Sequence, residues 1–171
     1  MSPTRLSRRE GWALGYPRSS QRIRGRVNQH EWESAPVDAS TALEWLHAFG
    51  VDACDLDDRS QVEHVLSLVP IAQRNADPAC LAVRAALKRY DGHVDKALEL
   101  YQRALAAAEG DTRLEAQIRE NLAILRILRK EMSEAEEVLA RALAIAPDDA
   151  RLLAIRAMLR GQRRDKRALE D

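Results

Sequence analysis

The segment ALELYQRA (residues 97–104) has a near copy, AEEVLARA, at residues 135–142. The same offset relates Ala85 to Ala123, each of which precedes its segment by the same distance. Positions three and four apart share one face of a helix, and alanine at a helix crossing allows the two backbones to approach closely. The spacing therefore predicts two copies of one closely packed helical pair.

Local signals predict where these helices begin and end. Asp77 suits an N-cap and Pro78 a first helical position, while Gly92 is expected just past the C-terminus of that helix. The second helix of the first copy is predicted at about residues 94–108, and Pro147 should stop the second helix of the second copy. Capping boxes at residues 112–115 and 133–136 predict the two helix starts of the second copy.

A further helical pair is predicted before the two copies, between residues 38 and 76. Capping boxes at residues 41–44 and 60–63 predict its two helix starts, and Gly50 is expected to end the first helix. Its sequence does not follow the pattern that the two copies share. Terminal units of stacked arrays are often atypical because one side faces water, so we interpret this pair as an N-terminal cap or a divergent repeat.

The helical pairs resemble the tetratricopeptide repeat (TPR) family. That family combines a small residue in the first helix with an Ala-x3-apolar-x2-Ala run in the second and a proline after it. Residues 90–105 match this pattern, and the second copy matches it again at Ala123, Ala135, Leu139, Ala142 and Pro147. The step from Ala123 to Ala157 equals the family's own period. The resemblance predicts repeats at residues 78–111 and 116–149 and a partial repeat at 150–171, within a repeat region of 77–171.

The composition agrees with an all-α fold, a TPR-like α-solenoid of antiparallel helix pairs with an irregular N-terminal arm. Apolar residues make up 46% of the 171 residues, but aromatic residues only 4%. No apolar run approaches the roughly 18 residues of a membrane span, so no membrane association is expected. Cys54 and Cys80 are too few for a disulfide framework and are interpreted as reduced thiols in a cytoplasmic protein.

Charge divides the chain into a basic arm, an acidic body and a basic tail. Residues 38–150 carry 13 basic and 21 acidic residues, a net charge of −8, whereas residues 151–171 carry seven basic and three acidic residues, a net charge of +4. The arm, residues 1–37, is rich in arginine and serine and is interrupted by prolines and glycines. Its candidate binding residues are Arg5, Arg8, Arg9, Trp12, Tyr16, Arg18, Arg22, Arg24 and Arg26.

Three interpretations of the arm stay open. It packs on the acidic body of its own or a sister subunit; it contacts nucleic acid, since arginine neutralises phosphate and aromatic rings stack on bases; or it is a targeting segment. A simple disordered tail is the remaining alternative.

No catalytic, cofactor or metal site is predicted. The sequence has no Gly-rich phosphate loop, no nucleophile elbow and no His-Glu-x-x-His motif. The four histidines show no ligand spacing, and the aspartates between residues 52 and 58 lack the glycine and glutamate of a calcium loop. We expect the protein not to be an enzyme.

The TPR resemblance implies that the first helix of each pair lines a concave groove. Projecting those helices gives a lining of Ala82, Ala86, Arg89, Tyr90, Gln117, Glu120, Asn121, Ile124, Leu128, Arg151, Ala154 and Met158. Such a surface, apolar with a polar rim, suits a partner peptide or an amphipathic helix. The competing interpretation is that the third unit or the arm fills these positions as ordinary core.

Two known TPR subtypes allow a comparison. Co-chaperone TPR domains hold a C-terminal carboxylate with lysine, asparagine and arginine side chains. Asn121 and Arg151 fall at matching positions, but Ala82, Ala86 and Ile155 stand where other clamp residues should be, which argues against that function. The overall plan resembles bacterial type III secretion chaperones for translocators, which are short chains of about three repeats with an apolar groove.

The sequence thus favours a non-enzymatic protein–protein interaction scaffold, adaptor or chaperone. The alternative is a nucleic-acid-associated adaptor that uses the arm and the basic run at residues 163–167. A homo-oligomer formed through the C-terminal repeat is a third interpretation.

Overall fold

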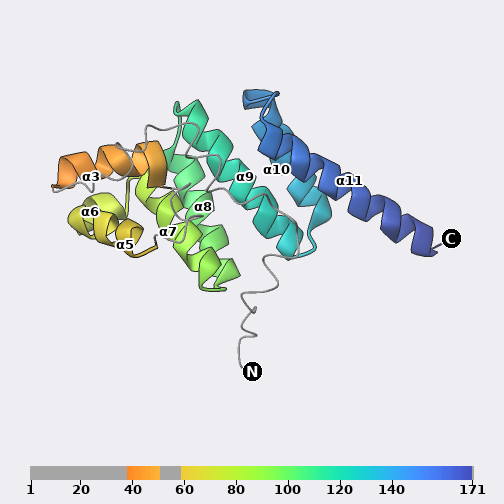
Figure 1. Cartoon of the computed structure of the whole chain (residues 1–171), viewed down its shortest axis with the longest axis horizontal. Coiled ribbons are helices and arrows are strands. Elements are labelled where there is room, and N and C mark those ends of the chain that lie inside the picture. The colour runs from red at the N-terminus through yellow and green to blue at the C-terminus, as the bar shows by residue number, and fades with distance from the viewer. Residues whose placement is uncertain (1–37, 51–58, 171) are drawn as a thin grey trace, which may run out of the picture.

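The computed structural model describes residues 38–50 and 59–170, with side chains for 38–48 and 59–162. This part of the chain is helical and contains no strand (Figure 1), which confirms the all-α prediction. The N-terminal elements are α3 (Ala39–Trp45), its π-helical continuation η2 (Leu46–Gly50), α5 (Arg59–Leu68) and α6 (Ile71–Arg74). The repeats follow as α7 (Pro78–Tyr90), α8 (Val94–Ala107), α9 (Thr112–Leu128), α10 (Met132–Ile145) and α11 (Ala150–Glu170).

The two helical pairs pack as the register of the two copies predicts. α7 packs on α8, α9 packs on α10, and α8 joins the pairs by contacting α9. The small positions at these crossings are fully buried in both copies, as is the ring of Tyr101, while Leu139 at the equivalent position is 2% exposed. Close packing through alanine is therefore the basis of the array.

The turn inside each pair also repeats. Gly92 has φ of 77°, and Lys130, at the equivalent position of the second copy, has φ of 63°. The left-handed conformation ends a helix and turns the chain back, and glycine adopts it more readily than lysine. Arg129 in the second turn forms an ion pair with Asp95 after the first, so the two turns lie side by side.

The N-terminal pair closes one end of the array. α3 contacts α5, and η2 packs on α7 (Figure 1). Trp45, Leu46 and Val65 supply buried side chains to this end of the core. Arg59 adds an ion pair of 2.8 Å to Asp91 at the end of α7.

At the other end, α11 buries only one side. Leu152, Ile155 and Leu159 are buried against α10 and α9. Ala157, the third member of the small-residue series, is exposed, because α11 runs on to Glu170 instead of turning back as a second helix. Over the described residues, no helix is both long and apolar enough to cross a membrane.

The structure confirms the predicted start of α7 and differs from the helix starts that the capping boxes predict. Asp77 caps α7, accepting a hydrogen bond of 3.0 Å from the Cys80 amide, and Pro78 is the first helical residue, as predicted. The predicted capping boxes are wrong. The N-caps of α3 and α9 are Asp38 and Asp111, which lie before the predicted caps Thr41 and Thr112. Each aspartate accepts a hydrogen bond from an amide of the first helical turn, so each helix begins earlier than predicted. α10 starts at Met132, before the predicted box, with no side-chain cap, and α5 starts at Arg59.

Candidate functional site

The predicted groove residues come from α7, α9 and α11, the first helices of successive units. α9 contacts both α7 and α11, so the three helices form a continuous row (Figure 1). The register aligns Ala82 with Glu120 and Ala154, and Ala86 with Ile124 and Met158. The structure therefore allows each row of equivalent positions to be compared for burial.

The α7 end of the predicted lining is mostly closed. Ala82 and Ala86 have no exposed surface, so the prediction that they form an open floor is wrong. α7 contacts α6, α8, α9 and η2, and eight of its thirteen residues are buried. Only the end of the helix stays open, where Tyr90 is 49% exposed and Arg89 is half-buried.

The middle of the lining, from α9, is closed except at its ends. Glu120, Asn121 and Ile124 are buried, while Gln117 is half-buried and Leu128 is 39% exposed. The Asn121 side-chain amide donates a hydrogen bond of 2.9 Å to the Gln117 carbonyl and so stays within its own helix. The Asn121 side chain is therefore hydrogen-bonded within α9, and its burial leaves little surface for contact with a partner.

The α11 end of the lining is open. Ala154 is exposed, and Arg151 and Met158 are half-buried. Arg151 forms an ion pair of 2.8 Å with the buried carboxylate of Glu120. This contact places the Arg151 side of α11 against α9, so exposed Ala154 and half-buried Met158 lie beside the α9 row.

The same ion pair bears on carboxylate binding. Arg151 is the one arginine at a clamp-like position, and the Glu120 carboxylate already neutralises it. A partner's C-terminal carboxylate would have to displace a buried negative charge at short range. The electrostatics of the groove therefore disfavour the co-chaperone mode of binding, in agreement with the sequence argument.

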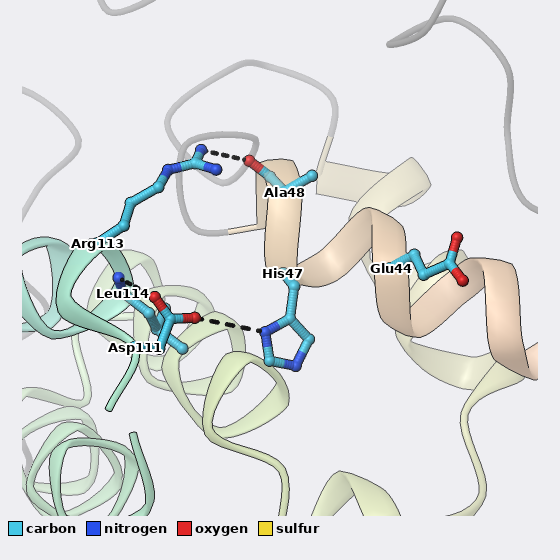
Figure 2. Close-up of a pocket in the computed structure, with 6 residues that line it drawn as sticks. All are labelled: Glu44, His47, Ala48, Asp111, Arg113 and Leu114. Carbon is cyan, nitrogen blue, oxygen red and sulfur yellow. Dashed lines mark hydrogen bonds and ion pairs between the residues drawn. The ribbon is translucent and has the colours of Figure 1, made fainter. Parts of the chain in front are cut away.

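A cavity that the sequence did not predict lies where the N-terminal pair meets the repeats. It measures about 370 Å³ and is lined by Glu44, His47, Ala48, Asp111, Arg113 and Leu114 (Figure 2). The sequence features that relate to it are the two N-cap aspartates, Asp77 and Asp111, which lie beside His47 in the structure. The sequence of residues 44–48 gives no indication of that contact.

The cavity walls are held by His47 and Arg113. Nε2 of His47 lies 2.9 Å from Oδ2 of Asp77, and Nδ1 lies 4.0 Å from Oδ2 of Asp111. The Arg113 guanidinium donates a hydrogen bond of 2.7 Å to the Ala48 carbonyl (Figure 2). Because the two aspartates cap α7 and α9, these contacts fasten η2 to the start of both repeats.

The described residues contain no group of histidine, cysteine and acidic side chains that could hold a metal ion. The two nitrogens of His47 face different carboxylates, so these three residues do not converge on a common point. Burial raises the pKa of the Cys80 thiol to about 12, with the nearby Asp77 carboxylate adding to the effect. At neutral pH Cys80 is therefore a protonated core residue and a poor nucleophile.

The predicted residues of the basic arm and the acidic segment at 52–58 lie outside the described residues. The basic run at 163–167 belongs to α11 and is helical.

A comparison with protein families matches residues 77–148 to the tetratricopeptide repeat. The match begins at the residue that caps α7 and ends after α10, so it spans both helical pairs. No curated protein and no solved structure gave a significant match to the chain. Residues 77–148 are therefore similar to the tetratricopeptide repeat family, whose members generally mediate protein–protein interactions.

Proposed function

We propose that this protein is a non-enzymatic interaction scaffold that binds a peptide or helix of another protein along α9 and α11. The observation that carries the proposal is the exposure of Ala154, beside half-buried Met158, next to the α9 row. Both side chains are apolar and lie on α11, which the ion pair between Arg151 and Glu120 holds against α9. A preformed apolar surface of this kind lowers the ordering cost of binding.

The proposed groove is shorter than the one predicted from sequence. Leu128, Ala154 and Met158 provide apolar surface, while Gln117 and Arg151 provide a polar rim. Ala82 and Ala86 are excluded because no partner atom can reach them. The finer roles of adaptor or chaperone, and a cytoplasmic location, belong to this proposal and depend on the partner.

A capture experiment tests the proposal. The full chain would serve as bait in a lysate of the source cells, beside Ala154→Asp and the matched control Ala140→Asp. Ala140 is exposed on α10, outside the proposed groove, so the control carries the same new charge elsewhere. We expect a protein partner that survives high salt and the control but is lost with Ala154→Asp, because the new carboxylate must be desolvated on binding.

Other outcomes would contradict the proposal. Equal capture of the partner by Ala154→Asp and Ala140→Asp would show that α11 is not part of the binding site. Material that disappears with salt and with nuclease treatment would favour the nucleic-acid alternative, since phosphate contacts weaken steeply as salt rises.

A further inference from the structure

The C-terminal ends of α7 and α9 form a second exposed feature, the Tyr90–Leu128 edge, defined by Arg89, Tyr90, Leu128 and Lys130. Tyr90 and Leu128 are exposed large hydrophobic residues, and they occupy equivalent positions in the two copies. A single exposed hydrophobic residue is ordinary on a protein surface. Two at the same position of adjacent repeats make a repeated feature of the array.

The two ends are physically joined. The Arg129 guanidinium at the end of α9 pairs with Asp95, which follows the turn after α7. Arg89 lies over the Tyr90 ring, 4.9 Å from its centroid, and its guanidinium is 3.3 Å from the Tyr90 hydroxyl. The Arg89 guanidinium therefore orients the Tyr90 ring. Because the ion pair of Arg129 with Asp95 joins the two helix ends, we treat Tyr90 and Leu128 as parts of one surface.

The charge of this edge is opposite to that of the body. Residues 88–95 and 126–131 carry five basic and three acidic residues, a net charge of +2, within a body whose net charge is −8. The three acidic residues are already neutralised: Asp91 by Arg59 and Lys88, Asp95 by Arg129, and Glu131 by Arg126 and Arg129. Lys130 is exposed and has no acidic partner among the described residues.

We infer that the Tyr90–Leu128 edge docks an acidic protein segment that places apolar side chains on Tyr90 and Leu128 and carboxylates near Arg89 and Lys130. Packed helices lie about 8–10 Å apart, a separation that residues three apart in an extended chain span. The inference rests on the proposed function, because it names the chemistry of a partner segment and adds a contact surface at the edge of the groove.

The test uses a random-peptide phage library selected on the immobilised full chain. Selected peptides are then measured on Tyr90→Ser, which lies outside the proposed groove, on Lys130→Glu and on Ile71→Ser. Ile71 is a matched control, because it is 68% exposed and lies on α6 at the other end of the array.

We expect the selected peptides to carry Asp or Glu beside apolar residues and to bind Ile71→Ser as they bind the unmodified chain. Affinity should fall about tenfold in Tyr90→Ser and several-fold in Lys130→Glu. It should also fall as salt rises, since the charged contacts are exposed.

Four results would overturn the inference. Peptides without an acidic bias, or peptides that bind Tyr90→Ser unchanged, would show that this edge is not the docking surface. If such peptides lose binding with Ala154→Asp, the proposed function stands and only this inference fails, whereas the absence of any selected peptide counts against both. Binding of a single-stranded oligonucleotide that depends on Tyr90 would assign the edge to nucleic acid.

Discussion

Helices α7 and α11 occupy equivalent places in the repeat but differ in how they are enclosed. Cys80 on α7 and Leu152 on α11 align through the register, and both are buried. Ala85 and Ala157 also align, yet Ala85 is fully buried and Ala157 is exposed. The comparison teaches that the repeat pattern specifies what a helix can pack against, whereas burial depends on which neighbours are present.

The largest expected difference concerns thiol reactivity. In a Cys54→Ser background, native Cys80 should react with iodoacetamide at least roughly a hundredfold more slowly than a cysteine introduced by Ala157→Cys. Burial raises the pKa of the Cys80 thiol to about 12, and the elements packed around α7 leave Cys80 no exposed surface. Mass spectrometry at mildly alkaline pH measures both rates. Rapid native labelling of Cys80 would mean that α7 is not enclosed.

Two adjacent leucines on α11 provide the next test. Leu152 is buried against α10 and α9, and its truncation leaves a cavity. Leu152→Ala should therefore lower the free energy of unfolding by about 2–5 kcal/mol. Leu153 is only half-buried, so Leu153→Ala should lower it by less than about 1 kcal/mol. Urea denaturation compares the two variants, and equal losses would show that a neighbour covers the outer face of α11.

Enlarging the aligned alanines tests the comparison directly. Ala85 is fully buried at a packed helix crossing that the added methylene groups must enter. Ala85→Leu should therefore destabilise the fold by about 1–3 kcal/mol. Ala157→Leu should change stability by no more than about 0.5 kcal/mol. Thermal unfolding of both variants is the measurement. A large loss from Ala157→Leu would contradict the exposure of this face.

The ion pair between α9 and α11 should give the smallest effect. Glu120→Gln removes the charge opposite Arg151 and should cost about 1–2 kcal/mol. This is less than for a fully buried pair, because the Arg151 side chain is 30% exposed. A double-mutant cycle with Arg151→Met isolates the coupling between the two side chains. A coupling of zero would mean that Glu120 and Arg151 do not position α11.

The sequence was sufficient to predict the packing within and between the repeats. The aligned alanines, the Asp77–Pro78 start of α7 and the turn at Gly92 all act through neighbours close in the chain or one repeat away. Capping was harder, because Asp111 and Thr112 are both good caps and only the folded chain shows which one accepts the amide.

The candidate site could be predicted only in part. The row formed by α7, α9 and α11 follows from the register, but the burial of Ala82 and Ala86 comes from a helix surrounded by α6, α8, α9 and η2. The N-terminal pair does not follow the repeat pattern, so its position could not be projected from the repeats. The contacts of His47 with Asp77 and Asp111 were missed for the same reason.

The contacts that fasten η2 to the repeats have a consequence for the order of folding. Arg113 and Ala48 are far apart in the chain, whereas α7 to α11 contact one another mainly through sequential neighbours. Contacts between distant residues require a longer loop to close and form more slowly. We therefore expect the repeats to form first and the N-terminal pair to dock on them late, so that His47→Ala should speed unfolding and leave the folding rate nearly unchanged.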